Sequence, residues 1–572
     1  MNKYISFVLF FILVLLINIF FSTFDKAFDL TADKRHSISN ESKKILQNLD
    51  DVIYIKIYLD GSFPSQFKHL QEELLSMLTS FKAISNQNID FVLINPNKSD
   101  DGFEKESLFK QLVKNGLKPT DVEVRSNSKK TNQIIFPGAL ISYKGKTQAI
   151  NFLKNSINKR PGENINSSIE NLEFEFISAF NKLIRNNKYD IAFLEGNGEL
   201  EFNEVYDLTE SVYNDNNRLS FYYNIDRFNI KQFFVDSTSN QIDISKQITA
   251  LNKYKIVVIA NPTVPFNMLE KFIIDQYLMN GGKIIWLVDG VNASMDSLNN
   301  NNFFIATRKN LNIDDMLYKY GVRINSDLIE DLRSTQIPVV TGYSNNIPQQ
   351  SFFSWPYFPL VFSESFHPIS KGLDAIKCNF VSSIDTIENA IKKTILLTSS
   401  KKSRIIRSPA KISLRLLENN LPVNSYNESY IPISVLLEGN FESVFKNRIV
   451  PKYKSLEFKD KSVNTQMIVI SDGDIAKNNV SESGNISPLG YDPFIKFTYS
   501  GNKIFLTNAI HFLCDDIGLA NLKLKELDLR LLDKEKISKF KLLVQYVNIF
   551  SPLLLLSIFS FLFLYFKKKK YA

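Results

Sequence analysis

The sequence predicts an α/β protein of several domains that is flanked by two transmembrane helices. Three observations favour this fold class: short apolar runs alternate with helical patterns, both ends carry long uncharged runs, and 572 residues are too many for one hydrophobic core. The fractions of apolar residues (44%) and charged residues (22%) are typical of a folded protein. Half of the net charge of +8 equals the four lysines near the C-terminus, so the composition does not indicate a nucleic-acid-binding protein.

The N-terminal run from Tyr4 to Phe24 has no charged residue and predicts the first transmembrane helix (residues 4–24). A helix needs about 20 apolar residues to cross a bilayer. A cleaved signal peptide is the alternative, but its apolar core is about 7–15 residues long and ends at a small-x-small site. The run here is longer, and residues 21–24 (FSTF) are a poor cleavage site. An uncleaved anchor is therefore the favoured interpretation.

The C-terminal run from Leu542 to Phe566 is also uncharged and predicts the second transmembrane helix (residues 542–566). Pro552 is tolerated in a membrane helix because neighbouring helices can satisfy the carbonyl that it frees. The lysines at 567–570 and Lys3 place both termini in the cytoplasm by the positive-inside rule. The residues between the two spans are then expected on the outer face of the membrane.

Residues 30–154 are expected to form a thioredoxin-like domain. Their pattern predicts a helix over Ser39–Leu49, with Ser39 or Asn40 as its cap, and then the order β-α-β-α-β-β, with a hairpin turn at Lys144-Gly145. Redox members of this fold carry CxxC between the first strand and the next helix, but that segment reads DGSFP (residues 60–64) here. Thiol–disulfide exchange is not available without thiols, so the domain is interpreted as a scaffold.

Residues 167–295 predict a doubly wound α/β domain, because short apolar strands alternate with helices as in a parallel sheet covered on both faces. The polar stretch Asn155–Asn166 is expected to be the linker before it, and a helix over Ser168–Arg185 is its first element. Residues 296–541 are less regular, and they predict a mixed α/β region. The expected strands are Asp190–Leu194, Lys255–Ala260, Lys283–Val288, Thr394–Leu397, Ile431–Leu437 and Met467–Ile470, and the expected helices of the doubly wound domain include Ile244–Leu251 and Asn267–Met279.

The segment Gly281-Gly282-Lys283 raises the question of a phosphate-binding loop, but its pattern favours the end of a helix. A Walker A loop needs G-x-x-x-x-G-K-[ST] after a strand. This segment lacks the first glycine and the hydroxyl, and it precedes a strand. A glycine in the left-handed conformation is a common helix end. We therefore expect Gly281 to end the helix and Gly282 to allow the tight entry into the next strand.

An acidic turn after the strand Asp190–Leu194 is a candidate binding surface. The sequence GNG at 196–198 begins like a dinucleotide fingerprint, but Glu201 occupies the third glycine position. Four carboxylates crowd the turn and would repel a pyrophosphate. They are Glu195, Glu199, Glu201 and Glu204. A solvated turn and a contact with a cation or a basic partner are both left open.

The run FFSWPYFP (residues 352–359) is the second candidate binding surface. Its aromatic residues are Phe352, Phe353, Trp355 and Tyr357. Exposed aromatic rings in this run could stack on a sugar or bind a partner. Buried rings would instead pack a proline-rich loop in the core, which is the commoner role of aromatic residues.

No motif predicts a catalytic residue, a metal site or a cofactor site. Residues 471–474 (SDGD) are favoured as a β-turn, because an EF-hand needs more acids at fixed spacing. The four histidines form neither HExxH nor H-x3–5-H. Neither cysteine lies at a strand-to-helix elbow with a nearby histidine. Whether Cys378 and Cys514 form a disulfide is left open.

Nine segments, in order over nearly the whole chain, carry a resemblance to a known family: RHSIS, FLEGNGELE, VVIANPTVPF, DQYLMNGGKIIWLVDGVNASMDSL, IPVVTG, HPISKGLDAI, VLLEGNFESVF, MIVISDGDI and NLKLKELDLRLLDKEK. They resemble the gliding-motility-associated ABC transporter auxiliary (substrate-binding-like) proteins of Bacteroidetes, GldG, the G component of the Gld system. The resemblance implies a protein of the cytoplasmic (inner) membrane, periplasmic in its bulk, that works with an ABC ATPase subunit and a membrane permease subunit. It also implies a flavodoxin/amidotransferase-like middle domain, related to a domain of an intraflagellar transport protein.

The favoured function is a non-catalytic, membrane-anchored accessory subunit of an ABC transporter complex associated with gliding motility. The amidotransferase nucleophile is a cysteine at a strand-to-helix turn, and no predicted turn here carries one. Cofactors and nucleic-acid partners are not expected. One alternative is an extracytoplasmic glycan- or peptide-binding module that uses the acidic turn and the aromatic run. A hydrolase is the other alternative, and it would need a nucleophile or a metal site that no motif supplies.

Overall fold

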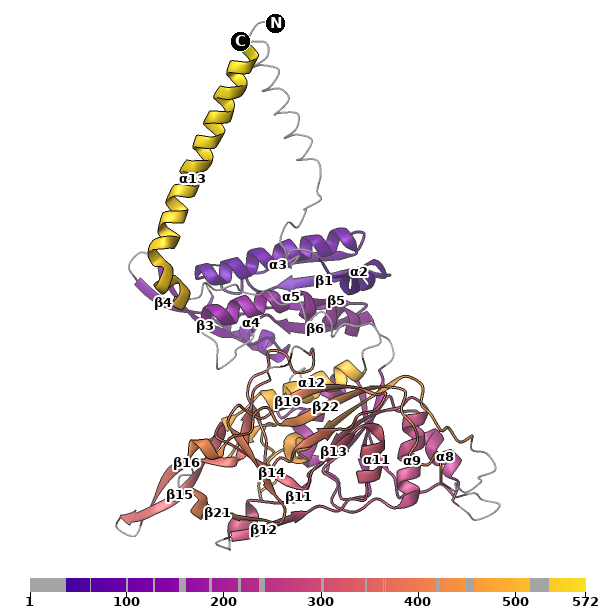
Figure 1. The fold of residues 1–572 in the computed structure, drawn as a ribbon. Coiled ribbons are helices and arrows are strands. Elements are labelled where there is room, and N and C mark those ends of the chain that lie inside the picture. The colour runs from indigo at the N-terminus through magenta and orange to yellow at the C-terminus, as the bar shows by residue number, and fades with distance from the viewer. Residues whose placement is uncertain are drawn as a thin grey trace. The chain divides into compact units, whose positions relative to one another are not determined.

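The computed structural model describes residues 38–571 of the chain, apart from short internal gaps, and within them the chain is a mixed α/β protein as predicted (Figure 1). The gaps are residue 62 and residues 99–100, 127–128, 154–160, 185–187, 214–217, 236–241, 300–302, 345–346, 364, 366, 418–421, 449–456 and 515–533. The first predicted transmembrane helix, residues 4–24, lies outside the described residues.

A four-stranded sheet organises the N-terminal part of the chain, with the strand order β2-β1-β5-β6. Its strands are β1 (Ile53–Ile57), β2 (Ile89–Leu93), β5 (Gly138–Tyr143) and β6 (Lys146–Asn151), and its helices include α2 (Asn40–Gln47), α3 (Ser65–Ile84) and α4 (Gly102–Lys114). β1 is parallel to β2 and antiparallel to β5, and β5 and β6 form the predicted hairpin at Lys144-Gly145. Helix α2 begins at its predicted cap, where Ser39 Oγ accepts a hydrogen bond from the backbone N–H of Ser42 (3.2 Å).

Helix α5 (Pro161–Ile184) packs into this N-terminal core, whereas the sequence places it as the first element of the following domain. It begins at Pro161, inside the predicted linker. Buried Phe176 and Phe180 lie one helical turn apart, and their ring centroids lie 5.8 Å from that of Phe152 and 6.1 Å from that of Phe81, respectively. The apolar spacing predicts the helix correctly, but it does not say which sheet the helix covers.

A hairpin of β3 (Thr120–Ser126) and β4 (Lys129–Ile135) is inserted between α4 and β5. Sequence analysis predicts no separate hairpin here, because its two strands, TDVEVRS and KKTNQII, are rich in polar residues. Its pairing is continuous from Thr120 opposite Ile135 to Ser126 opposite Lys129.

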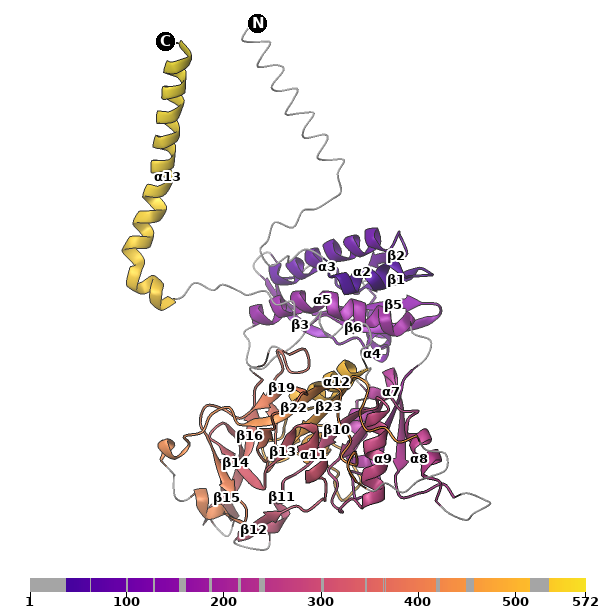
Figure 2. The ribbon, with the colours of Figure 1, turned by 45° about the vertical axis from the view of Figure 1, so that its right-hand side comes forward.

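A seven-stranded sheet forms the centre of residues 188–514, with the order β19-β22-β23-β10-β9-β7-β8 (Figure 2). Its strands are β7 (Asp190–Glu195), β8 (Asn224–Asn229), β9 (Ile256–Ala260), β10 (Lys283–Leu287), β19 (Lys392–Thr398), β22 (Pro432–Gly439) and β23 (Thr465–Ile470). The strands β23, β10, β9, β7 and β8 run parallel to one another, and β22 is antiparallel to both of its neighbours.

Hydrophobic cores lie on both faces of this sheet. β9 is buried along its whole length, and its side chains alternate between the cores: Val257 and Ile259 belong to one, Ile256 and Val258 to the other. The first core is covered by α8 (Ile244–Leu251), α9 (Met268–Met279) and α11 (Asp314–Tyr320), and the second by α12 (Gly501–Leu513).

Three strands of this sheet come from residues 296–541, which the sequence predicts as a separate region. β23 lies between β22 and β10, and Ile284 is paired with Met467. The boundary predicted at residue 295 therefore does not divide two sheets. The predicted apolar runs Ile431–Leu437 and Met467–Ile470 coincide with β22 and β23 to within two residues. An apolar run predicts a buried strand but does not specify its neighbour in the sheet.

The glycine pair after α9 is a helix end, as predicted. Gly281 has φ of 94°, in the left-handed region, and the N–H of Gly282 donates to the carbonyl of Tyr277 (3.0 Å). A Cβ on Gly282 would lie 2.3 Å from the Tyr277 ring, so only glycine fits the entry into β10. The Nζ of Lys283 donates to the carbonyl of Leu513 (2.5 Å), which engages this lysine within the protein.

Small sheets and short helices complete residues 188–514. The remaining strands are β11 (Val291–Asn292), β12 (Phe303–Arg308), β13 (Val322–Ile324), β14 (Asp327–Asp331), β15 (Ser334–Ser344), β16 (Ile347–Val361), β17 (Ile376–Lys377), β18 (Ile384–Thr386), β20 (Ser403–Arg407), β21 (Ala410–Ser413), β24 (Tyr491–Asp492) and β25 (Phe497–Thr498). The remaining short helices are η1 (Asn203–Val205), α6 (Tyr206–Thr209), α7 (Leu219–Tyr222), α10 (Asp296–Asn299), η2 (Leu414–Leu417), η3 (Val423–Ser425) and η4 (Asp474–Ala476).

Helix α13 (Lys534–Tyr571) forms a separate unit and contains the second predicted span. Residues 548–568 within it are long and apolar enough to cross a membrane, with a mean hydropathy of 2.2. Pro552 lies inside the helix, as predicted. Among the described residues this is the one helix with these properties.

Candidate functional site

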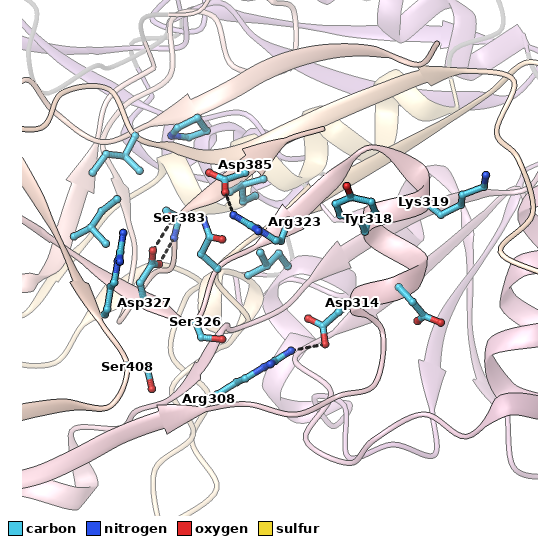
Figure 3. A pocket seen from close by; sticks show the side chains of 18 of the residues that line it. Arg308, Asp314, Tyr318, Lys319, Arg323, Ser326, Asp327, Ser383, Asp385 and Ser408 are labelled. Atoms are coloured by element: carbon cyan, nitrogen blue, oxygen red, sulfur yellow. Dashed lines mark hydrogen bonds and ion pairs between the residues drawn. The ribbon is translucent and has the colours of Figure 1, made fainter. Parts of the chain in front are cut away.

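An open cleft of about 1400 Å³ lies among residues 308–448 (Figure 3). Helix α11, the strands β13, β14, β18 and β20, and two segments, residues 428–432 and 443–448, together contribute most of its walls. A cavity of this size exceeds the range of about 300–1,000 Å³ of small-molecule pockets. Its walls are mainly polar and charged, so it is suited to a polar or charged ligand of extended shape.

Three ion pairs lie in the cleft walls. Arg308 pairs with Asp314 (2.8 Å) and Arg323 with Asp385 (2.5 Å), as Figure 3 shows, and Arg448 pairs with Asp315 (3.0 Å). Both side chains of each pair are exposed to 37% or more, so each pair contributes about 0–1 kcal/mol of stability. A ligand with both acidic and basic groups could replace the first two pairs at small cost, whereas Asp315 also pairs with the buried Lys271 (2.5 Å).

Asp327, at the start of β14, forms the buried side of the cleft. Its carboxylate accepts hydrogen bonds from the backbone N–H of Ser383 (2.8 Å) and from Ser383 Oγ (2.6 Å). Burial raises the pKa of Asp327, and Arg407 opposite it acts in the other direction. Arg407 itself is exposed, and in the described part of the chain its charge acts on Asp327 without a close ion pair. It is the guanidinium of the cleft that is available to an incoming carboxylate or phosphate.

The acidic turn after β7 lies at the carboxyl end of the parallel strands, as the sequence predicts, but most of its polar groups are engaged within the protein. Glu195 forms an ion pair with Arg227 (2.5 Å). Glu199 is buried, which raises its pKa, and it accepts a hydrogen bond from the backbone N–H of Asn197 (2.7 Å). Glu201 is exposed. Of the three candidate residues in the turn, Glu201 is therefore the one best placed to meet a partner.

The turn is held to helix α9 by a second buried carboxylate. The side-chain amide of Asn197 donates to Glu270 Oε2 (3.0 Å), and Glu270 also accepts from the backbone N–H of Asn267 (2.9 Å), which closes the capping box of the helix. The glycines on either side of Asn197 have positive φ, and a Cβ on Gly198 would lie 2.0 Å from Thr263 Oγ1. The GNG segment thus builds a tight structural turn.

The SDGD segment after β23 meets the end of β10 and forms a buried acidic cluster that sequence analysis does not predict. The N–H of Gly473 donates to Asp289 (2.6 Å), and Lys309 Nζ donates to the same carboxylate (3.0 Å). Burial and the neighbouring Asp289 raise the pKa of Asp472 well above its usual range and that of Asp474 to about 6. Parallel strands bring these aspartates together from positions more than 180 residues apart.

The aromatic residues of the second candidate surface differ in their exposure to solvent. Trp355 and Tyr357 are buried at 0% and 3% exposure in a hydrophobic core, so neither can stack on a ligand. For these two residues the structure has the buried alternative of the two that the sequence leaves open. Phe352 is 50% exposed and Phe353 is half-buried. The side chains of β16 become buried where the strand enters the hydrophobic core. A run of aromatic residues in the sequence does not show where a strand enters the core.

Cys378 and Cys514 are both buried, and no disulfide joins them. Burial and the neighbouring Asp472 carboxylate raise the pKa of the Cys378 thiol well above its ordinary value, which disfavours the nucleophilic thiolate. Within the described residues no cluster of histidine, cysteine, aspartate and glutamate could hold a metal ion. The cleft residues carry no motif, because they come from seven separate segments between residues 308 and 448. No signal in the sequence joins those segments.

Comparison with known proteins places the seven-stranded sheet in a family. A family described as an ABC-type uncharacterized transport system matches residues 188–509, and a domain of unknown function, DUF7088, matches residues 32–142. An uncharacterized protein of Borreliella burgdorferi strain B31 is 22% identical over 458 residues, which cover 76% of this chain and 78% of the relative.

Two solved structures show limited similarity. The mmIFT52 N-terminal domain aligns with 57% of this chain and 98% of its own, at 14% identity and a TM-score of 0.30. The exo-β-1,4-mannosidase Op5Man5 of Opitutaceae bacterium strain TAV5 aligns with 77% of this chain and 49% of its own, at 8% identity and a TM-score of 0.19. Scores this low support no argument about fold or function. The family match, in contrast, covers more than half of the chain, and the chain belongs to the family of ABC-type uncharacterized transport system auxiliary components.

Proposed function

We propose that this chain is a non-catalytic, membrane-anchored accessory subunit of an ABC transporter complex that contains an ABC ATPase subunit and a membrane permease subunit. The observation that carries the proposal is the family match over residues 188–509, which spans all seven strands of the large sheet. The candidate membrane helix at residues 548–568 supports the anchoring. In this proposal the N-terminal run is a second anchor, both termini are cytoplasmic, and the bulk of the chain is periplasmic.

Three finer parts of the proposal rest on the sequence and the topology. The nine segments that resemble GldG proteins of Bacteroidetes support a role in gliding motility. The order β2-β1-β5-β6, with one parallel and two antiparallel pairings, supports a thioredoxin-like scaffold without CxxC at the N-terminus. Helices on both faces of the parallel strands support a doubly wound, flavodoxin/amidotransferase-like core for the large sheet.

Purification of the tagged full chain from native membranes in a mild detergent tests the proposal. We expect an ABC ATPase and a polytopic permease to be recovered in stoichiometric amounts, as measured by mass spectrometry. Membranes that carry the untagged chain provide the control for nonspecific recovery. Recovery of the chain alone, or with cell-wall fragments only, would contradict the accessory-subunit function and redirect attention to the cleft.

A second candidate function is a binding module for cell-wall glycan or peptide, and the charged cleft is the observation that favours it. We expect Arg407→Ala to weaken binding of soluble peptidoglycan fragments about tenfold, because an arginine–carboxylate hydrogen bond is lost. Isothermal titration calorimetry measures the affinity. Arg415→Ala is the matched control, since Arg415 is exposed but does not line the cleft. Equal affinities of the two variants, or no binding by the unmodified chain, would remove this candidate.

A further inference from the structure

One wall of the charged cleft contains the edge of a strand. β20 pairs with β14 in a two-stranded antiparallel sheet, and Ile405 and Arg407 of β20 line the cleft. In an antiparallel sheet, opposite residues alternate between pairs that exchange backbone hydrogen bonds and pairs that do not. The register of β14 and β20 therefore shows which residues of β20 keep their backbone groups for another partner.

The even-numbered residues of β20 use their backbone groups to bond to β14. At one end of the strand, the N–H of Ser408 donates to the carbonyl of Ser326 (3.0 Å), and both residues line the cleft (Figure 3). At the other end, the N–H of Leu332 donates to the carbonyl of Lys402 (3.1 Å). Both bonds continue the register of the β14–β20 pairing. The odd-numbered residues of β20 therefore direct their N–H and C=O groups away from β14.

This side of β20 already accepts an antiparallel partner at its first residue. The N–H of Ser403 donates to the carbonyl of Glu428 (3.1 Å), and the N–H of Glu428 donates to the carbonyl of Ser403 (2.9 Å). The pairing ends there, since among the described residues no strand lies beside Ile405 or Arg407 on this side. We call the backbone groups of these two residues the open edge. Each residue presents one donor and one acceptor to an added strand.

The chemistry of the open edge selects its occupant. An extended peptide carries amide donors and carbonyl acceptors with the same two-residue period, whereas a glycan has no amide backbone. Arg407 adds an exposed guanidinium, which suits an acidic side chain on the peptide. We propose that the cleft binds an extended acidic peptide segment of a partner protein as an added strand on β20. The proposal rests on the premise of the second candidate function, that the cleft is a binding site.

A phage-displayed library of random linear octapeptides, panned against the purified full chain in mild detergent, tests the proposal. We expect enriched peptides that contain an acidic residue. The most enriched peptide is synthesised with a fluorescent label, and fluorescence anisotropy measures its dissociation constant. N-methylation of one peptide amide at a time should raise this constant at least about tenfold at every second position and less than about twofold between them, because only alternate amides face β20. This scan leaves the protein unchanged.

Ile405→Pro is the corresponding change in the chain. Proline removes the N–H of residue 405, which β14 does not use, and proline is tolerated at the edge of a sheet. Ile405→Ala is the matched control, because it loses the same side chain but keeps the N–H. We expect the peptide to bind Ile405→Pro at least about tenfold more weakly than Ile405→Ala. Matching circular dichroism spectra check that both variants fold.

Three results would overturn the proposal: no enriched peptide, an N-methylation effect without a two-residue period, or equal affinities of Ile405→Pro and Ile405→Ala. Soluble peptidoglycan fragments judge the cell-wall function separately. If the fragments bind and no peptide does, strand addition is wrong and the cell-wall function stands. If a peptide binds with the expected period and the fragments do not, the proposal stands without that function. Recovery of transporter subunits is independent of both results.

Discussion

Replacing Asp275 by alanine is expected to lower the free energy of unfolding of residues 188–514, which we call the large-sheet domain, by about 3–5 kcal/mol. Asp275 lies in α9, and it is fully buried. Its carboxylate accepts hydrogen bonds from Tyr320 Oη (2.8 Å), Ser443 Oγ (2.7 Å) and the backbone N–H of Val444 (3.0 Å). It thereby joins α9 to α11 and to the loop after β22. Alanine would leave these buried donors without an acceptor.

Chemical denaturation followed by tryptophan fluorescence measures this effect, because Trp286 and Trp355 both lie within the large-sheet domain. Asp275→Asn should cost less than alanine, since its amide oxygen can still accept one of the hydrogen bonds. The matched control is Asp385→Ala, which removes an exposed carboxylate paired with Arg323 and should cost at most about 1 kcal/mol. Equal losses for Asp275→Ala and Asp385→Ala would show that the buried network contributes little.

The contribution of Asp474 to the stability of the large-sheet domain is expected to fall as the pH rises from about 4 to about 6, because Asp474 must lose its proton in a buried site. The pKa of Asp474 is raised from 3.8 to about 6, first by burial and then by Asp289. The folded state therefore binds more protons than the unfolded state in this range. The stabilisation is complete below the unfolded pKa and is lost as the pH passes the folded pKa, with a total on the order of 2–3 kcal/mol.

The groups that face Asp474 come from several elements. Lys309 and Lys477 lower its pKa, whereas Asp289 and Glu204 raise it. The buried carboxyl groups of Asp472, Asp275, Asp327 and Glu199 have raised pKa values too, so they contribute in the same direction. For this reason the test compares variants rather than absolute profiles.

Melting temperatures from pH 4 to pH 8 should therefore depend less on pH in Asp474→Asn than in the unmodified chain. Asparagine keeps an oxygen that can accept from Asn261 Nδ2, which donates to Asp474 Oδ1 at 3.0 Å. Asp385→Asn, at an exposed strand position, is the control and should follow the unmodified chain. If the profile of Asp474→Asn has the same slope as that of the unmodified chain, the titration of Asp474 does not contribute to stability.

Patterns of local spacing predict the elements of this chain well. The runs at 431–437 and 467–470 coincide with strands, Ser39 caps its helix, and Gly281 ends α9 in a left-handed conformation. Each of these features depends on a few neighbouring residues: a polar side chain next to a free N–H, a glycine where φ is positive, or an apolar run long enough to be buried. The prediction of a membrane-spanning helix likewise depends only on the hydropathy of one segment, residues 548–568.

Local sequence patterns do not predict which distant elements pack or pair with one another. The period of α5 predicts a helix, yet Phe176 packs on the N-terminal core rather than on the large sheet. The strand β23 pairs with β10 across some 180 residues of sequence, which removes the predicted boundary at residue 295. An apolar face of a helix or strand must pack against another apolar face. Many faces in the chain have a similar size and shape, so the sequence does not specify which one it is.

The sequence by itself determined the α/β class, the helix and strand ends marked by caps and glycines, and an apolar C-terminal run of membrane-spanning length, because these are properties of short segments. The tertiary structure alone decided which strands share the seven-stranded sheet, which aromatic residues are buried, and which charges line the cleft. Trp355 is in the core and Phe352 is exposed although they stand three residues apart, and Asp289 meets Asp474 although they stand far apart. Both outcomes follow from the packing of the whole chain, which places each side chain in water or in the interior.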